Sequence, residues 1–342
     1  MTVEIEILDE RDAAEWNRYV ERSADANPFH RAEALAVEAA YSGTTCHRLV
    51  GYKGQEPVGI FPVFERSKGP ITAAFSPPPP LWIHRLGPAL LNVDKLSQRK
   101  AERRIRRFVE GVLEWLDDEC SPNLLRVKTE CTFADLRPFK WADADVTPEF
   151  TYVVDLPDGR EDLLAIFSSD ARSNIRNLDA DAVFEEGDAG PTFEEGDAAD
   201  VERIVDHVRD RFDAQGEPFT LPRGFARELY ETLPEGAMRT YVCRHEGEFV
   251  GGILTYETDE WIHRWQGGVT PDVDFPVNDN LDWTVMTDAM ERGLDAYDLV
   301  GAGDPRINDY KAKFGPSVET FHSVERSSLA MDALLGLYTR VK

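Results

Sequence analysis

The sequence predicts a mixed α+β protein of two tandem domains, each built from a mixed β-sheet flanked by helices. Its 342 residues exceed the size of one ordinary core and suit two domains of roughly 150 to 190 residues. Hydrophobic residues make up 42 % of the chain, which is enough to fill two cores. One order of elements, a strand hairpin followed by a helix and a short apolar strand, also occurs twice. This order indicates mixed sheets that are covered by helices.

The two predicted hairpins are related by an offset of 192 residues. His47–Glu65 and Arg239–Glu257 each have the pattern of a strand, a tight polar turn that contains glycine, and a second strand. The offset aligns identical residues, namely Val50 with Val242, Val58 with Val250, Gly59 with Gly251 and Glu65 with Glu257. We therefore expect an internal duplication.

The other elements follow from the spacing of apolar residues. This spacing predicts helices at residues 13–23, 28–41, 97–118, 161–178, 197–212 and 280–296, and strands at residues 124–128, 150–156 and 297–301. Asn27 is expected to cap the second helix, with Pro28 at its first position. We place the domain boundary near residue 150. The prediction is a first domain at 1–150, a second at 151–328 and a helical tail at 329–342.

Charge is the strongest feature of the composition. The formal net charge is −26 and the sequence pI is about 4.6, while lysine accounts for only 9 of the 38 basic residues. An acidic, lysine-poor surface suits solubility at high salt, so we interpret it as adaptation to a halophilic cytoplasm. The alternative is an ordinary acidic protein. Because no basic stripe is evident, we expect no DNA partner.

Several segment types are not expected. The first residues are charged and lack an apolar core, so we predict no secretory signal. No apolar run reaches the roughly 18 to 20 residues that span a bilayer. The four cysteines are dispersed, with no CxxC pair and no histidine at ligand spacing, so the sequence predicts neither disulfides nor a metal site. A reducing, cytoplasmic location fits these features.

A set of short motifs in the last third has a specific order. Asn278–Leu281 opens the late helix, Tyr297–Leu299 forms the next strand, and Tyr310–Gly315 follows with the sequence Tyr-Lys-Ala-Lys-Phe-Gly. In this order the chain resembles the FemAB-like branch of the GNAT superfamily, whose members have a Phe-Lys-x-x-Phe-Gly motif after an aspartate-bearing strand. Tyr310 replaces the first aromatic residue of that motif. The resemblance extends over roughly residues 25 to 325 and includes Asn27–Phe29 and the arginine-rich helix end Arg172–Arg176.

The resemblance implies two tandem GNAT domains and an acyltransferase. One branch of the family transfers amino acids from aminoacyl-tRNA to cell-wall precursors, and another contains acyl-CoA-dependent acetyltransferases that act on sugars, lipids or polysaccharides. Simple GNAT enzymes hold the CoA pyrophosphate on an Arg/Gln-x-x-Gly-x-Gly/Ala loop. The corresponding stretch here, Trp265–Val277, contains Gly267 and Gly268 without that spacing. The sequence therefore leaves the donor open between acyl-CoA and aminoacyl-tRNA.

Acyl transfer requires a deprotonated nucleophile, donors for the developing oxyanion and an anion site for the phosphates of the donor. Lys311 is the expected catalytic cation, with a solvated surface lysine as the alternative. Asp304 follows the late strand and is expected to act as a base or to orient an amine, or else to cap a turn before Pro305. Arg306 and Tyr310 are expected to line the same site.

Further binding residues are predicted from their places on the expected helices and strands. Arg172 and Arg176 lie four apart on one helix face and are expected to clamp a phosphate, or to be a solvated helix end. Asn278 and Asn280 precede the late helix, where they are either caps or contacts to the donor. Trp265 and Gln266 end an apolar strand, with Trp265 as a cleft wall and Gln266 as a contact. Two histidines, His263 and His30, are expected to be packed side chains rather than bases.

The predicted function is transfer of an acyl group from acyl-CoA to an amine or hydroxyl of a small-molecule or sugar acceptor, by direct attack and without a tightly bound cofactor. The alternatives are an aminoacyl-tRNA-dependent transferase, the one case in which tRNA is a partner, and a catalytically silent binding module. No Ser-His-Asp arrangement, P-loop or dinucleotide fingerprint occurs, so hydrolase, kinase and dehydrogenase readings have no support.

Overall fold

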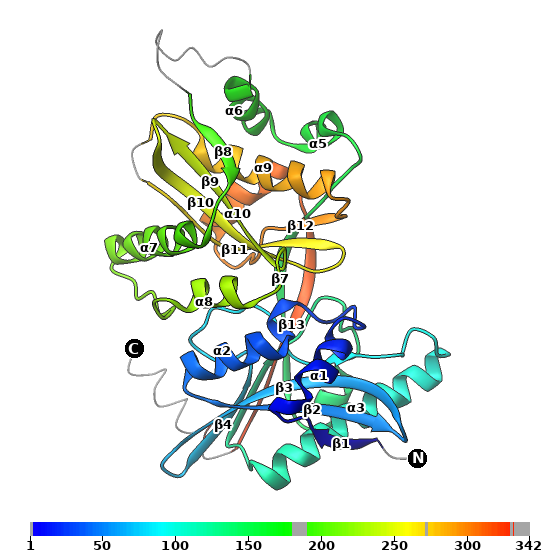
Figure 1. Cartoon of the computed structure of the whole chain (residues 1–342). Helices are drawn as coiled ribbons and strands as arrows, with labels where there is room; N and C mark the ends of the chain where they lie inside the picture. The colour runs from blue at the N-terminus through cyan, green and yellow to red at the C-terminus, as the bar shows by residue number, and fades with distance from the viewer. Residues whose placement is uncertain (1–2, 180–189, 271–272, 329–330, 332–342) are drawn as a thin grey trace. The chain divides into compact units, whose positions relative to one another are not determined.

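The computed structural model describes residues 3–179, 190–270, 273–328 and 331. These residues divide into two compact units, the first made of residues up to Glu149 together with those from Thr320 onward, and the second of Phe150–Glu319 (Figure 1). The sequence placed the end of the second domain at residue 328, whereas the chain returns to the first unit at Thr320. The helical tail expected at 329–342 lies, except for Met331, outside the described residues.

The first unit is built on a six-stranded mixed sheet. Its strands β4 and β6 are parallel, and the other neighbouring pairs are antiparallel. The spatial order is β1 (Glu4–Ile7), β2 (Thr45–Lys53), β3 (Glu56–Lys68), β4 (Ile71–Ser76), β6 (Leu124–Lys128) and β13 (Ser317–Ser327), and the short β5 (Ala89–Leu90) pairs with β3.

The second unit repeats this arrangement. Its strands β11 and β12 are parallel, and the other pairs are antiparallel. The spatial order is β8 (Thr192–Glu195), β9 (Met238–His245), β10 (Glu248–Glu257), β11 (Trp261–Val269), β12 (Ala296–Asp298) and β7 (Asp145–Asp155). Position by position, the two sheets have the same strand directions. The predicted mixed α+β class and the repeat of hairpin, helix and strand are therefore confirmed.

Helices of similar order accompany both sheets (Figure 1). In the first unit they are α1 (Ala13–Val20), α2 (Ala32–Ser42), α3 (Gln98–Glu119) and α4 (Arg137–Trp141), with short 3₁₀ turns at Glu10–Asp12 and Pro28–His30. In the second unit they are α5 (Arg160–Ile166), α6 (Ser169–Asp179), α7 (Ala198–Gln215), α8 (Phe225–Thr232), α9 (Val277–Glu291) and α10 (Pro305–Lys311), followed by a 3₁₀ turn at Ala312–Phe314.

Three predicted helices differ from the structure in where they begin or are interrupted. The helix expected at 28–41 is a 3₁₀ turn and then α2, because Arg31 adopts an extended conformation between them. Asn27 is a cap as predicted, and its side chain accepts a hydrogen bond from the Phe29 amide at 2.9 Å. The helix expected at 161–178 is divided at Phe167 into α5 and α6. The helix expected from residue 280 begins at Val277 and is preceded by Pro276.

Glycine allows α7 to approach the sheet of the second unit. A Cβ atom on Gly268 would lie 2.8 Å from the Cβ of His207, and one on Gly252 would lie 2.8 Å from the side chain of Ile204. Both positions therefore require glycine. None of the described helices has both the length and the apolar character needed to cross a bilayer.

The glycine of the Lys-x-x-Phe-Gly motif has a clear structural reason. Gly315 has a φ of +65°, and a Cβ there would lie 2.6 Å from the carbonyl oxygen of Ile166. The preceding Phe314 is fully buried, and its ring packs edge-on against Phe167 with centroids 5.2 Å apart. The motif thus fixes the backbone that follows α10 against the end of α5.

We expect Gly315→Ala to lower the free energy of unfolding by roughly 2 to 4 kcal/mol, because it adds a steric clash to the left-handed strain. Gly293→Ala is the matched control, since Gly293 has a φ of +81° and open space around it. Chemical denaturation in concentrated KCl measures both changes. Equal losses in the two variants would show that the contact with Ile166 has no part in the requirement for glycine.

Candidate functional site

Lys311 is held inside the second unit at the end of β12. Its Nζ donates hydrogen bonds to the carbonyl oxygens of Val300 at 2.5 Å and Gly301 at 2.7 Å. The residue is 9 % exposed, which is unusual for a lysine. The alternative of a solvated surface lysine is therefore wrong. An ammonium has three N–H bonds, so these two carbonyls leave one N–H for a further acceptor.

The turn that presents these carbonyls is strained. Val300 has a φ of +51°, a conformation that a β-branched residue rarely adopts. Asp298 holds the turn by accepting from the Val300 amide at 2.8 Å and from the Thr151 hydroxyl at 2.5 Å. The Gly301 amide in turn donates to the Thr151 oxygen at 3.0 Å. The late strand therefore ends in a fixed loop.

The environment of Lys311 lowers its pKa from 10.5 to about 8. Burial is the main cause, and the positive charge of Arg264 adds to it, while the carboxylates of Asp298 and Asp282 act in the opposite direction. A lysine with such a pKa changes its charge close to neutral pH. Shifts of this kind are typical of functional sites.

Asp282 is the centre of a buried polar cluster on α9. Its carboxylate is fully buried and accepts from Arg264 Nη1 at 2.7 and 2.6 Å, from the Tyr297 hydroxyl at 2.6 Å and from the Tyr310 hydroxyl at 2.7 Å. Burial, followed by the negative charge of Asp282, raises the pKa of both tyrosines well above 10. Both hydroxyls therefore remain protonated donors.

A β-bulge positions Arg264. In the pairing of β10 with β11, Leu254 is opposite Gln266 and Thr255 is opposite Arg264, so Trp265 is the additional residue. The bulge interrupts the regular alternation of side chains between His263 and Trp265. Trp265 is buried, with its ring 6.0 Å from that of Phe225, and Gln266 is 5 % exposed.

Arginine side chains gather around Gly267. A Cβ on Gly267 would lie 2.6 Å from Arg264 Nη2, so the guanidinium lies over this glycine, and Arg211 Nη1 donates to the Gly267 carbonyl at 3.3 Å. Partial burial lowers the pKa of Arg211, and the positive charges of Arg264 and Arg306 lower it further. Three guanidinium groups therefore share one region. The sequence predicted Arg306 but missed Arg211 and Arg264, which lie on α7 and β11.

His263 is a packed side chain, as expected. It is 3 % exposed and stacks on the ring of Tyr256, with centroids 4.5 Å apart. Its Nδ1 lies 3.1 Å from a carboxylate oxygen of Asp298, and since a carboxylate only accepts, Nδ1 carries the proton. His30 in the first unit is also fully buried. Burial lowers its pKa to about 4, so it is neutral at pH 7.

The other predicted residues are more dispersed. Asp304 is exposed and caps α10 by accepting from the Arg306 amide at 2.8 Å. Arg172 donates to the Phe167 carbonyl at 2.6 Å, and Arg176 pairs with Glu161 at 3.2 Å. Among the described residues, neither arginine contacts Lys311. The catalytic role of Asp304 and the phosphate clamp remain predictions.

Asn278 and Asn280 are not caps. The helix begins at Val277, three residues before the expected start at 280, so both side chains belong to its first turn, and the N-cap position is Pro276. Asn280 is buried and donates to the carbonyl of Pro276 at 2.9 Å, while Asn278 is exposed. The stretch before α9, where simple GNAT enzymes hold pyrophosphate, includes residues 271–272, which lie outside the described residues.

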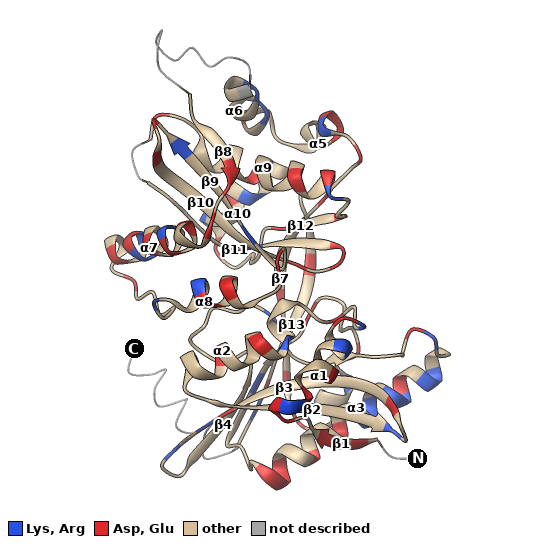
Figure 2. Ribbon diagram, in the orientation of Figure 1, with Lys and Arg blue, Asp and Glu red and all other residues tan. Residues whose placement is uncertain are grey.

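The sequence also missed a basic stripe. Figure 2 shows Lys and Arg on the first half of α3, and Asp and Glu toward its end. A cavity of about 250 Å³ in the first unit is lined by Val3, Lys53, Lys100, Arg103, Arg104 and Arg107. The expectation that the chain has no basic stripe is therefore wrong. The basic residues Lys100, Arg103, Arg104 and Arg107 are three and four residues apart, which indicates one face of a helix. The net charge of −26 does not reveal such a local group of cations.

Comparison with known proteins gives one family match, which lies within the second unit. The family model of the acetyltransferase (GNAT) domain matches residues 169–312, the part of the second unit that contains Arg211, Arg264, Asp282 and Lys311. Residues 169–312 are thus similar to a GNAT acetyltransferase domain, and the fold of the chain is that of FemX and of a tandem GNAT protein. This similarity supports an enzyme of the acyltransferase class. A comparison with curated protein sequences gives no match.

Solved structures with the GNAT fold resemble the whole chain. FemX has a TM-score of 0.70 at 13 % identity, over 93 % of this chain and 96 % of its own. A C-terminal domain assigned to a lysylphosphatidylglycerol synthetase from Agrobacterium fabrum has a TM-score of 0.55 at 15 % identity, over 96 % and 95 %. A tandem GNAT protein from the clavulanic acid biosynthesis pathway has a TM-score of 0.50 at 12 % sequence identity, and the match covers 95 % of this chain and 98 % of that protein. At these identities the similarity concerns the fold.

Proposed function

We propose that the second unit transfers an acyl group from acyl-CoA to an amine or hydroxyl of a small-molecule or sugar acceptor. The observation that carries this proposal is the arrangement at the end of β12. The ammonium of Lys311 is desolvated there, is fixed on two carbonyls, and titrates near neutral pH. Such a fixed cation suits a developing oxyanion, because it needs no reorganisation during the reaction.

The reaction is direct attack on the thioester carbonyl. The acceptor nitrogen or oxygen forms a bond to the carbonyl carbon, and the resulting oxyanion is stabilised by the remaining N–H of Lys311. Collapse of this tetrahedral species breaks the C–S bond. The proton that the acceptor loses goes to the departing thiolate, directly or through water, so no covalent enzyme intermediate is needed.

The arginines near Gly267 are proposed to bind the phosphates of the donor. Arg264 is neutralised by Asp282, but Arg211 and Arg306 have no carboxylate partner among the described residues. Guanidinium groups that are close together without counter-ions favour a phosphate between them. This arrangement would replace the missing glycine-rich loop.

A second donor, aminoacyl-tRNA, is favoured by two observations. The stretch before α9 lacks the pyrophosphate motif, and the basic stripe on α3 provides cations that the sequence reading had not found. The similarity to FemX and to the domain of a lysylphosphatidylglycerol synthetase agrees with such a donor. In this case the same attack occurs on an ester carbonyl, and the leaving group is the ribose hydroxyl.

Thermal unfolding in concentrated KCl, with and without acetyl-CoA and longer acyl-CoAs, tests the proposal. A ligand at 100 times its Kd should raise Tm by roughly 5 to 10 °C. Arg211→Ala should reduce this shift, whereas Arg227→Ala, an arginine on α8 paired with Glu202 and Glu231, should leave it unchanged. If no acyl-CoA shifts Tm and charged tRNA does, the second donor replaces the first.

The rate should also depend on pH through Lys311. The catalytic form is the ammonium, and a pKa of about 8 means that this form is lost as the pH rises above 8. We therefore expect kcat/KM to fall on the alkaline side with a midpoint near pH 8. In Lys311→Arg, the alkaline decrease of kcat/KM should occur at higher pH, because a guanidinium remains charged. If the midpoint of this decrease is unchanged in that variant, the group that titrates is not Lys311.

A further inference from the structure

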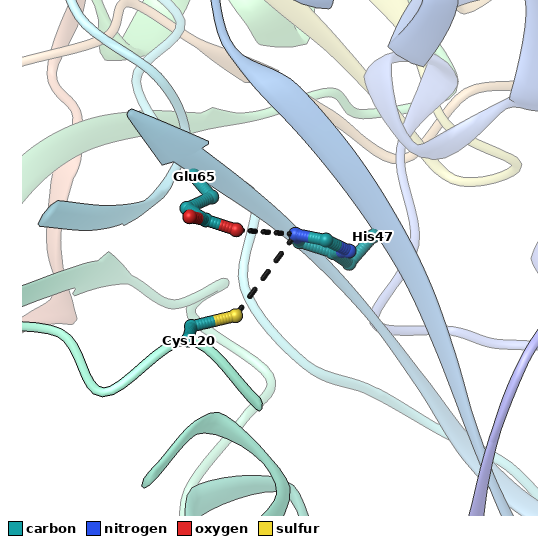
Figure 3. Close-up of side chains that lie close together, drawn as sticks. All are labelled: His47, Glu65 and Cys120. Carbon is teal, nitrogen blue, oxygen red and sulfur yellow. Dashed lines mark hydrogen bonds and ion pairs between the residues drawn. The ribbon is translucent and has the colours of Figure 1, made fainter. Parts of the chain in front are cut away.

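Three side chains that bind metals meet in the first unit. His47 lies on β2, Glu65 on β3, and Cys120 is the C-cap of α3. His47 Nε2 is 2.9 Å from Glu65 Oε2 and 4.0 Å from Cys120 Sγ, and the three ligand atoms all lie within 4.8 Å of one another (Figure 3). All three residues are half-buried.

The geometry does not fit a catalytic relay. In a nucleophile–base–carboxylate relay, the imidazole contacts the nucleophile with one ring nitrogen and the carboxylate with the other. Here Glu65 and Cys120 both approach Nε2 of His47, as Figure 3 shows. Three donor atoms that converge on one point are instead the arrangement of ligands around a shared ion.

The second unit shows what occupies the equivalent position there. The offset of 192 residues relates His47 to Arg239 and Glu65 to Glu257, and Arg292 is the C-cap of α9 as Cys120 is the C-cap of α3. Arg239 Nε lies 3.1 Å from Glu257, and Arg292 pairs with the same carboxylate at 2.6 Å. Two cationic side chains thus neutralise Glu257 and connect the β9–β10 hairpin to the end of α9.

We propose that the first unit binds a divalent transition-metal ion of the zinc class through His47, Glu65 and Cys120. The ion takes the place of the two guanidinium charges of the second unit and connects the β2–β3 hairpin to the end of α3. Imidazole, carboxylate and thiolate are the donors that zinc prefers, and three protein ligands leave a fourth position for water. On binding, the thiol of Cys120 gives its proton to solvent.

Sequence spacing does not reveal this site. His47 is 18 residues from Glu65 and 73 residues from Cys120, so no short ligand motif exists. The pairing of β2 with β3 and the length of α3 bring the three together. The repeated architecture allows the two units to be compared. In the second unit, the equivalent glutamate is Glu257, and the positively charged Arg239 and Arg292 lie beside it.

The test is a titration of the full chain with Co²⁺ after treatment with a chelator, followed by competition with Zn²⁺. We expect one ion per chain and a near-ultraviolet band from thiolate-to-cobalt charge transfer, lost when Zn²⁺ is added. Cys120→Ser should abolish the band, and Cys131→Ser, a half-buried cysteine elsewhere in the same unit, should retain it. At a Zn²⁺ concentration about 100 times Kd, Tm should rise by roughly 5 to 10 °C in wild type and in Cys131→Ser.

Glu65→Gln provides a second variant that keeps the side-chain volume and should weaken Co²⁺ binding at least tenfold. The proposal is overturned if the wild-type chain shows no thiolate band, or if Cys120→Ser binds Co²⁺ with the same band and stoichiometry as wild type. Equal Tm shifts with Zn²⁺ in wild type and Cys120→Ser would assign binding to surface carboxylates and would likewise overturn it.

Discussion

Lys311→Met should reduce kcat by roughly 100- to 1000-fold while changing KM little, since loss of one oxyanion donor has effects of this size. Methionine keeps the length of the aliphatic stem and removes only the ammonium. The ammonium is held by the Val300 and Gly301 carbonyls, so we expect it to stabilise the oxyanion rather than to bind the acceptor before the reaction. Steady-state kinetics with the donor found by thermal unfolding measure both constants.

Lys313→Met is the matched control for this variant. Lys313 is two residues away and has different partners. Its Nζ lies 3.6 Å from a carboxylate oxygen of Asp170 and 3.5 Å from one of Asp279. It should retain most of the activity. If both variants lose activity equally, the effect arises from the local fold; if neither does, Lys311 has no part in the mechanism.

Lys311→Met should also have a cost in stability that the sequence did not indicate. Its ammonium satisfies two carbonyls of a turn in which Val300 is strained. Leaving buried carbonyls without donors costs roughly 1 to 3 kcal/mol. Activity must therefore be compared at a temperature at which both variants remain folded.

The sequence predicted the elements that depend on local patterns. The hairpins that contain Gly54 and Gly247, the strand at 124–128 and the tandem order follow from alternation, turn residues and spacing. The motif at Tyr310–Gly315 was also visible, because it contains two lysines in a chain where lysine is rare. Its position after the late strand, together with the resemblance, predicted Lys311 as a site residue.

The remaining part of the site depends on contacts that local patterns do not encode. Arg264 reaches Asp282 through a bulge at Trp265, and a strand read by alternation contains no signal for an additional residue. Arg211 lies at the end of α7, where the sequence suggests only a solvated cation. The left-handed conformation at Val300 was equally hidden, because local preference argues against it in a β-branched residue.

Asp282→Asn should lower the free energy of unfolding by about 3 kcal/mol. The carboxylate is fully buried, and neutralising it leaves Arg264 without its counter-ion and changes the acceptor for the hydroxyls of Tyr297 and Tyr310. Removing one partner of a buried pair typically costs about 3 to 5 kcal/mol, and the lower value applies here because Arg264 keeps some exposure.

Asp288→Asn on the same helix is the control. Asp288 accepts from Tyr241 and Arg292, but its side chain is 39 % exposed, so water can compensate for the lost charge. Denaturant midpoints at fixed salt compare the two variants. The double variant with Arg264→Met should recover part of the loss, because an isolated buried charge costs more than an apolar pair of similar size. A loss in Asp282→Asn no greater than in Asp288→Asn would mean that the cluster around Asp282 orients the site without stabilising the unit.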